Sequence, residues 1–257
     1  MNSGFLTICD DNVIEIDDNL YQSHLKLSNY KFSSKENLFS TVLEGIHQFA
    51  AKVSDILEQS DDSYPPLPIQ IDEFWMKSDE QSIRNVLLLS GSVESVTTFF
   101  VVKGKIYDLK DRLIGGFQIK TARIPYVADT ETKRELPHAL DDPKIFSFKP
   151  ISQSGENTIE LPFSFDEQSF LAYEHFPGAP ILPASQIIGL AKQACADHFN
   201  VQVNRVGRSS FIQPVQSGSI YMLEMTHLQG DKVKFVVSSE DKVHTRGVMS
   251  ISESTDN

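Results

Sequence analysis

The feature that most constrains the fold is a long, proline-free helical segment. Residues 37–59 carry apolar side chains at spacings of three and four, the period of a helix with one buried face. A proline-containing stretch at 60–68 then ends the helix, because proline cannot continue it. A single long helix needs a sheet to cover its apolar face, which predicts an α+β unit. The apolar positions are Leu38, Val42, Ile46, Phe49, Val53, Ile56 and Leu57.

Strand-like runs lie on both sides of this helix. Two short segments of alternating polarity precede it, at 12–16 and 19–28. Four runs follow it that are rich in β-branched and aromatic residues and are divided by Ser, Asp, Gly or Lys turns. The pattern predicts a helix against an antiparallel meander. The four later runs are 69–76, 83–93, 96–108 and 112–124.

The second half of the chain repeats this order of elements. A strand-like run precedes a helix from Pro183 to about Phe199, and another meander follows. The segment between the halves is polar and proline-containing, as linkers are. We therefore predict an N-terminal domain over 1–126, a linker over 127–155 and a C-terminal domain over 156–257. Two such α+β units in succession predict that they pair side by side.

Charge and composition exclude several classes of function. The formal net charge is −12 and no block of Lys and Arg occurs, which argues against nucleic acid or an anionic membrane as the main partner. Cys9 and Cys195 form no CxxC pair, and no set of residues has metal-ligand spacing, so no metal or cofactor is predicted. No apolar run approaches the ~20 residues that span a bilayer. We expect a soluble, cytoplasmic protein.

One stretch of the second half carries a candidate catalytic residue. Residues 172–198 place His175 and Gly178 on a turn rich in Pro and Gly, directly before the second predicted helix. A turn histidine of this kind taken alone is more often bonded to its own loop than catalytic. The first two turns of the helix also contain no carboxylate. The surrounding motif decides between these interpretations.

The motif "HFPGAPILPASQIIGLAKQA" resembles that of bacterial 3-hydroxyacyl-thioester dehydratases of the hot dog fold. Their pattern is His-Phe-Pro-Gly-x-Pro, two hydrophobic residues, Pro-Gly and then a helix. The later stretch "SFIQPVQSGSIYMLEM" resembles the strand, Pro-Val turn and Gly that follow the helix in those enzymes. The resemblance covers about 158–252. It implies a double hot dog, in which two long central helices are each wrapped by a curved antiparallel sheet and form a pseudo-dimer.

The family's catalytic pair is divided between the two halves. In the family an acidic residue of the other subunit stands fourteen positions after the histidine, and counting from His175 leads to Gly189. The first-half helix resembles the family's Glu-x-x-x-Gln helix, with Glu44 as the acid and Gln48 one turn later. Fourteen residues before Glu44 stands Tyr30. The resemblance thus implies one composite site of His175 and Glu44, and a degenerate second site of Tyr30 and Gly189.

The implied chemistry is removal of water from a 3-hydroxyacyl thioester, a hydro-lyase reaction. A neutral imidazole at His175 is a suitable base for the proton on C2. Burial of Glu44 would raise its pKa and favour a protonated form that donates to the departing hydroxyl. Gln48 would orient this carboxyl, while the Ile181 carbonyl would fix the imidazole. Ala184 replaces a family glycine and offers its backbone N–H to the thioester carbonyl.

Other interpretations stay open at this point. Glu44 can be an ordinary surface carboxylate, Gln48 and Gln193 can be structural, and His47 is predicted to be solvated. The alternative functions are an A-factor-type acyl-transfer synthase, a hot dog thioesterase and a non-catalytic acyl-binding subunit. A glutamate as the acid resembles the branch that dehydrates without moving the double bond.

The partners implied are an acyl carrier protein or coenzyme A as the carrier of the acyl group. Whether two pseudo-dimers pair as a homodimer is left open by the sequence. Because carrier protein is acidic, basic side chains are candidates for docking it. These are Arg123, Lys192, Arg205 and Arg208.

Overall fold

The computed structural model describes residues 7–29, 38–58, 66–77, 86–124, 146–155, 157–165 and 181–253. The chain divides into two compact units, 1–126 with 204–208 and 127–203 with 209–257. Each unit contains one of the two predicted long helices, α1 (Leu38–Glu58) and α3 (Ala184–Phe199), so the helix predictions and the α+β class are confirmed. Neither helix among the described residues is long and apolar enough to cross a membrane.

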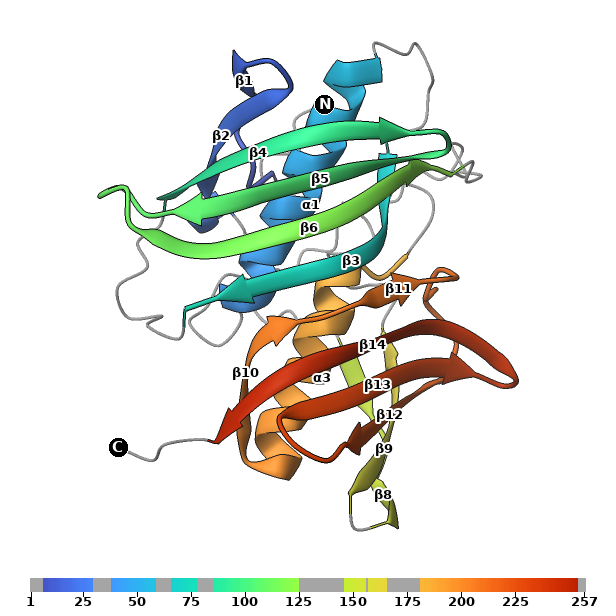
Figure 1. The fold of residues 1–257 in the computed structure, drawn as a ribbon. Helices are drawn as coiled ribbons and strands as arrows, with labels where there is room; N and C mark the ends of the chain where they lie inside the picture. Colours follow the sequence, from blue (N-terminus) through green and yellow to red (C-terminus); the bar gives the residue numbers. More distant parts are fainter. Residues whose placement is uncertain are drawn as a thin grey trace. The chain divides into compact units, whose positions relative to one another are not determined.

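The first unit contains an antiparallel sheet in the order β1-β2-β4-β5-β6-β3, with α1 along one face (Figure 1). A short 3₁₀ helix (Leu27–Asn29) follows β2. The strands are β1 (Ile14–Asp17), β2 (Leu20–Lys26), β3 (Pro66–Met76), β4 (Val86–Val96), β5 (Phe99–Tyr107) and β6 (Leu113–Arg123).

The core of the first unit lies between α1 and this sheet. Every residue from 38 to 47 is buried, so the first half of α1 is covered on all sides. The ring of Phe49 meets that of Phe117 edge to face, with centroids 6.2 Å apart. A side chain at Gly91 would begin 3.1 Å from Phe49, so the glycine allows the helix to approach β4. Ile56, predicted on the buried face, is instead 40% exposed because it lies in the last turn.

The sheet bends around α1 at irregular pairings. The register between β3 and β6 shifts after Pro68 and again after Ile71, and that between β5 and β6 shifts after Ile106. Such bulges increase the local twist and bend the strand. The strand β3 begins at Pro66, three residues earlier than predicted, since proline is tolerated in the first residues of a strand.

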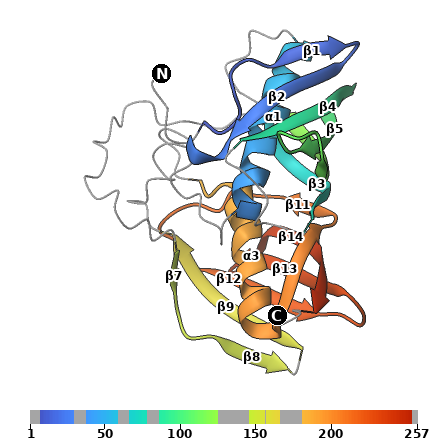
Figure 2. The same cartoon turned by 90° about the vertical axis from the view of Figure 1, so that its left-hand side faces the viewer.

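In the second unit α3 lies along one face of a second antiparallel sheet and contacts β12 (Figure 2). Its strand order is β10-β14-β13-β12-β9-β7, with β11 beside β14 and β8 beside β9, and residues 204–206 at the end of β10 are counted in the first unit. The strands are β7 (Phe146–Phe148), β8 (Ser152–Gly155), β9 (Thr158–Phe165), β10 (Val201–Val206), β11 (Ser209–Phe211), β12 (Tyr221–His227), β13 (Lys232–Ser239) and β14 (Lys242–Glu253).

Two of these strands lie inside the segment that was predicted to be a linker. Both β7 and β8 pair antiparallel with β9, so residues 146–148 and 152–155 belong to the second sheet. The first alternates over only three residues, Phe-Ser-Phe, and the second contains no apolar side chain, so neither is recognised as a strand from sequence. Their pairing partner, β9, keeps a regular alternation of buried and half-buried residues.

Candidate active site

Glu44 lies in the fully buried half of α1 and is only 2% exposed. Burying a carboxyl group is costly unless hydrogen bonds compensate for the water that it loses. The alternative of an ordinary surface glutamate is therefore wrong. His47, three residues further, is also buried at 5% exposed, which contradicts the prediction that it is solvated. The all-round burial of this half of α1 explains both outcomes.

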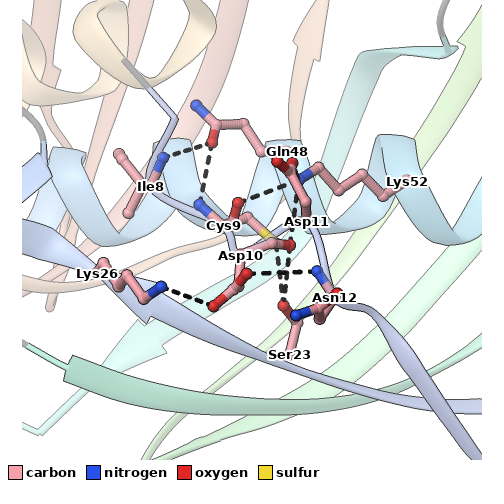
Figure 3. A network of polar contacts seen from close by, with 9 residues as sticks. All are labelled: Ile8, Cys9, Asp10, Asp11, Asn12, Ser23, Lys26, Gln48 and Lys52. Carbon is pink, nitrogen blue, oxygen red and sulfur yellow. Dashed lines mark hydrogen bonds and ion pairs between the residues drawn. The ribbon is translucent and has the colours of Figure 1, made fainter. Parts of the chain in front are cut away.

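Gln48, one turn after Glu44, is hydrogen-bonded to it. Its Nε2 donates to Glu44 Oε1 over 3.2 Å. Its Oε1 accepts from two backbone N–H groups, that of Ile8 at 2.9 Å and that of Cys9 at 3.1 Å (Figure 3). Only the carbonyl end of an amide can accept two N–H donors, so these bonds fix which end of the Gln48 amide faces Glu44.

The segment that donates to Gln48 is bonded both to β2 and to α1. The backbone N–H of Asp10 donates to His24 O and that of Lys26 donates to Ile8 O, each over 2.8 Å, so residues 8–10 pair with β2. Cys9 itself forms an isolated bridge with Leu25. Its own N–H and C=O are therefore turned away from β2 and toward the helix.

Gly45, the neighbour of Glu44, permits the close approach of these elements. A side chain there would begin 2.8 Å from Leu25 Cδ2 and 3.1 Å from Ile8 Cγ2. Real Cβ atoms essentially never come within 3.0 Å of another atom, so a larger residue would displace the buried side chain of Leu25 and crowd that of Ile8. The glycine therefore helps to place the partners of Gln48.

Lys52, two turns after Glu44, binds the same segment from the same face of α1. Its Nζ donates to Cys9 O at 3.0 Å, to Asp10 O at 3.1 Å and to Asp11 Oδ1 at 2.8 Å. An ammonium group has three donors, and all three are used. A second ion pair, Lys26 Nζ with Asp10 Oδ2 at 2.8 Å, lowers the pKa of the Asp10 carboxyl through its hydrogen bond.

In the second unit, the described part of the His175 motif begins at Ile181, directly before α3. The helix begins at Ala184, and its N-cap residue Pro183 provides no side-chain hydrogen bond. Just before it, Leu182 N donates to Val215 O over 2.8 Å, and Ile181 bridges Gln216. The start of α3 is thus held by the loop that precedes β12.

That loop is itself held by two buried side chains of the second sheet. The Tyr221 hydroxyl accepts from Gln216 N at 2.8 Å and donates to Gln216 O at 3.1 Å. His244 Nδ1 lies 2.9 Å from Pro214 O, and because a carbonyl only accepts, this nitrogen carries the proton. His244 Nε2 lies 2.7 Å from Ser239 Oγ. Both side chains stabilise the contact between the loop and the start of α3.

The second unit does not reproduce the arrangement around Glu44. Gly189, at the position that corresponds to the acid, is half-buried on α3. Gln193, one turn later, is exposed and donates to Asp197 Oδ1 over 2.8 Å. The glutamine of this helix thus makes an ordinary surface contact one turn along α3. His175, Gly178 and Tyr30 lie outside the described residues.

Two of the candidate docking residues are engaged in ion pairs. Arg123 binds Asp55 at 2.5 Å and Glu58 at 2.6 Å, and Arg205 binds Glu73. These contacts connect elements of the first unit and reduce the charge that either arginine can offer to a partner. Arg208 is exposed.

The partners of Gln48 were not predicted from the sequence. Gly45 acts through close approach and residues 8–10 act through their backbone groups, and neither leaves a motif in the sequence. One signal was available: Glu44, Gln48 and Lys52 are spaced four apart and therefore share one face of the helix.

Comparisons with known proteins agree with this architecture. Residues 151–248 match the family model of the ApeI-like dehydratases, described as ApeI dehydratase. Comparison with proteins of curated function gives no significant match.

Solved structures match almost the whole chain at low sequence identity. A Lactobacillus plantarum protein described as an oleoyl thioesterase has a TM-score of 0.63 and 12% identity, with 92% of this chain and 96% of that chain covered. The tesB protein of Mycobacterium avium subspecies paratuberculosis has a TM-score of 0.57 and 8% identity, with 93% and 94% covered. The peroxisomal multifunctional enzyme type 2 of Drosophila melanogaster has a TM-score of 0.53 and 13% identity, with 91% and 48% covered.

At these identities the solved structures establish the fold alone. The resemblance to hot dog dehydratases that the sequence indicated is nevertheless confirmed. The second half of the chain matches the ApeI-like dehydratases, and the chain as a whole is similar in fold to hot dog proteins.

Proposed function

We propose that this protein dehydrates a 3-hydroxyacyl thioester to the trans-2-enoyl thioester. The chain would be a double hot dog, a fused pseudo-dimer with one composite site that uses Glu44 from the first unit and His175 from the second. The observation that carries the proposal is the buried carboxyl of Glu44, which is hydrogen-bonded through Gln48. The match of residues 151–248 to a dehydratase family supports the second half of the pair, since His175 falls inside it.

In the proposed reaction two groups act on adjacent carbons. The imidazole of His175 takes the proton from C2, and Glu44 gives a proton to the hydroxyl on C3. The C3–O bond breaks, the C2–C3 double bond forms, and one water molecule leaves. His175 then holds one proton more and Glu44 one fewer, and exchange with solvent restores both. The Ile181 carbonyl would orient the imidazole from beside the turn that carries Gly178.

The thioester carbonyl gains negative charge as C2 loses its proton. Backbone N–H groups at the start of a helix stabilise such charge, because they lack partners within the helix. The start of α3 at Ala184, without a side-chain cap, supports this role. The second possible site, of Tyr30 and Gly189, would be inactive because it lacks both the acid and the histidine.

Conversion of a 3-hydroxyacyl thioester to the enoyl thioester tests the proposal. We expect the purified protein to produce the enoyl thioester, followed by mass spectrometry and by ultraviolet absorbance. Glu44→Gln and His175→Ala should each lower kcat by about 10²- to 10⁴-fold. The matched controls Glu94→Gln and His198→Ala change exposed residues and should retain full activity.

Two results would contradict the proposal. Full activity in Glu44→Gln or His175→Ala would exclude the composite site. Release of free acid without enoyl product would instead identify a thioesterase, in which the same carboxylate activates water. Substrates carried on acyl carrier protein and on coenzyme A should be compared, since the exposed Arg208 favours an acidic carrier protein.

A further inference from the structure

Two side chains that share one face of α1 with Glu44 bind a single short segment of the first unit. Glu44, Gln48 and Lys52 are each one turn apart, and the last two both bind residues 8–11, which we call the N-terminal brace. We propose that Lys52 and the N-terminal brace position Glu44 for catalysis by locking the Gln48 amide in one orientation. The proposal rests on the proposed function of Glu44 as the acid and adds Lys52 as a positioning residue.

The N-terminal brace is held on both sides. Toward β2 it makes two backbone hydrogen bonds of 2.8 Å, through Asp10 N and Ile8 O. Toward α1, Cys9 has both of its backbone groups bonded, the N–H to Gln48 and the C=O to Lys52. Ile8 and Cys9 are 1% and 0% exposed, so water does not compete for these bonds. The N–H groups that meet Gln48 are therefore held in fixed positions.

Lys52 closes the arrangement from the solvent side. It is the only one of the three helix residues with a full charge at a partly exposed position, and its side chain is 28% exposed. Its three bonds to Cys9 O, Asp10 O and Asp11 Oδ1 draw the N-terminal brace onto the helix. Removal of the ammonium group would leave two carbonyl oxygens facing the helix without this partner.

The locked amide also determines how Glu44 can be protonated. Gln48 Nε2 is only a donor, so Glu44 Oε1 is held as an acceptor. A protonated oxygen is the weaker acceptor, so the acidic proton is favoured on Oε2. This oxygen is the one that would give its proton to the substrate hydroxyl. The N-terminal brace thus specifies which oxygen of Glu44 acts.

A merely structural role of the N-terminal brace predicts different behaviour from a positioning role. The decisive variant is Gln48→Glu, which is nearly identical in shape. An ionised side chain there still accepts from Ile8 and Cys9 but cannot donate to Glu44. We expect the amides of Ile8 and Cys9 to stay protected from hydrogen exchange while kcat falls about 10²-fold, the effect of misplacing a catalytic group. KM should change less than twofold.

A second variant tests Lys52. In Lys52→Met we expect loss of protection at the Ile8 and Cys9 amides and a fall of kcat by about 10-fold, again with little change in KM. Lys52→Arg retains the charge and the hydrogen-bond donors, so it should keep most of the exchange protection and most of the wild-type kcat. Lys103→Met, at an exposed position of β5, is the matched control and should change neither.

The outcomes separate this proposal from the proposed function. Wild-type kcat in Gln48→Glu or in Lys52→Met would overturn the positioning role. If the wild-type protein does not dehydrate the substrate, the proposed function fails. The positioning role is then tested by the NMR resonance of the Glu44 carboxyl carbon. That resonance should move in Gln48→Glu and in Lys52→Met but not in Lys103→Met, and an unchanged resonance in the first two would overturn the proposal.

Discussion

At the scale of single residues, the position of one carboxyl group matters most. Glu44 is buried, and one of its oxygens is fixed by Gln48 at 3.2 Å. An aspartate, which is shorter by one methylene, would keep a carboxyl group but move it away from Gln48 Nε2. The site therefore depends on the length of the side chain as well as on its charge.

The variant Glu44→Asp tests this dependence. We expect kcat to fall by about 10²-fold, because a displacement of about 1 Å of a catalytic group has an effect of this size. The measurement is the rate of enoyl thioester formation at saturating substrate. Glu94→Asp, at an exposed position of β4, serves as the control. Wild-type kcat in Glu44→Asp would show that the carboxyl is not held as tightly as the contact with Gln48 requires.

Both cysteines should be inert toward thiol reagents in the folded protein. Cys9 and Cys195 are each 0% exposed. Burial raises the pKa of the Cys9 thiol, and it raises the pKa of the Cys195 thiol to about 12. Because the thiolate is the reactive form, neither should react with a disulfide reagent at neutral pH, whereas both should react in denaturant. Reaction of either thiol in native protein would contradict the packing around it.

At the scale of elements, the turn between β5 and β6 depends on one ionised carboxyl. Asp108 Oδ1 accepts from the backbone N–H of Lys110 at 2.8 Å and of Arg112 at 2.9 Å, and Oδ2 binds Arg112 Nε at 2.7 Å. The hydrogen bond from the Arg112 backbone is the main cause of a lowered pKa at Asp108. The turn also holds Asp111 in a left-handed conformation, with φ of 57°.

The sign of the pKa shift predicts how stability changes with pH. A carboxyl whose pKa is lower in the folded state stabilises the fold above its unfolded pKa, and this contribution disappears as pH falls through the folded pKa. Asp108→Ala should therefore lower the melting temperature at pH 7. The difference from wild type should shrink as the pH falls below about 4. Asp231→Ala, in an exposed turn, is the control, and a difference that stays constant with pH would contradict the role of ionisation.

The pairing of β4, β5 and β6 requires glycine at position 104. A side chain there would begin 2.5 Å from Phe117 Cζ and 2.7 Å from the backbone oxygen of Ser90. We expect Gly104→Ala to lower the free energy of unfolding by about 1–3 kcal/mol, measured by denaturant titration. Gly155→Ala is the matched control in β8, because no atom of the described residues lies within 4 Å of its added carbon. Equal stability of the two variants would contradict the close strand packing.

Sequence periodicity identified the long elements and failed for the short ones. Both long helices were predicted to within one residue, because an apolar period sustained over several turns is specific for a helix. The strands β7 and β8 were not predicted. They have three and four residues, too few for an alternating pattern to identify a strand, and both form by pairing with β9.

The candidate site was predictable only where side chains carry it. The resemblance of the first-half helix to the Glu-x-x-x-Gln pattern of the dehydratases identified Glu44 and Gln48, and the structure brings these two together. The partners of Gln48 are backbone N–H groups of Ile8 and Cys9, which every residue possesses, so the sequence contains no trace of them. The burial of His47 was missed because the first half of α1 is buried on all sides, whereas its sequence indicates only one apolar stripe.

At the scale of the whole molecule, the proposed function requires one active site for every chain. A stable analogue of the enoyl product should therefore bind with a stoichiometry of one, measured by calorimetry. The double variant Glu44→Gln with His175→Ala should be hardly slower than either single variant, because residues that act as a unit are not additive. Two bound analogues for each chain, or additive losses, would contradict a single composite site.

The contacts of the N-terminal brace also bear on the order of folding. Ile8 and Gln48 are 40 positions apart in the chain, and closing a loop of that length costs about 3 kcal/mol of chain entropy. The turns of α1 need only local contacts and form earlier. During refolding we therefore expect helix content to return before the Glu44 carboxyl is oriented. Enzymatic activity should then recover more slowly than helix content.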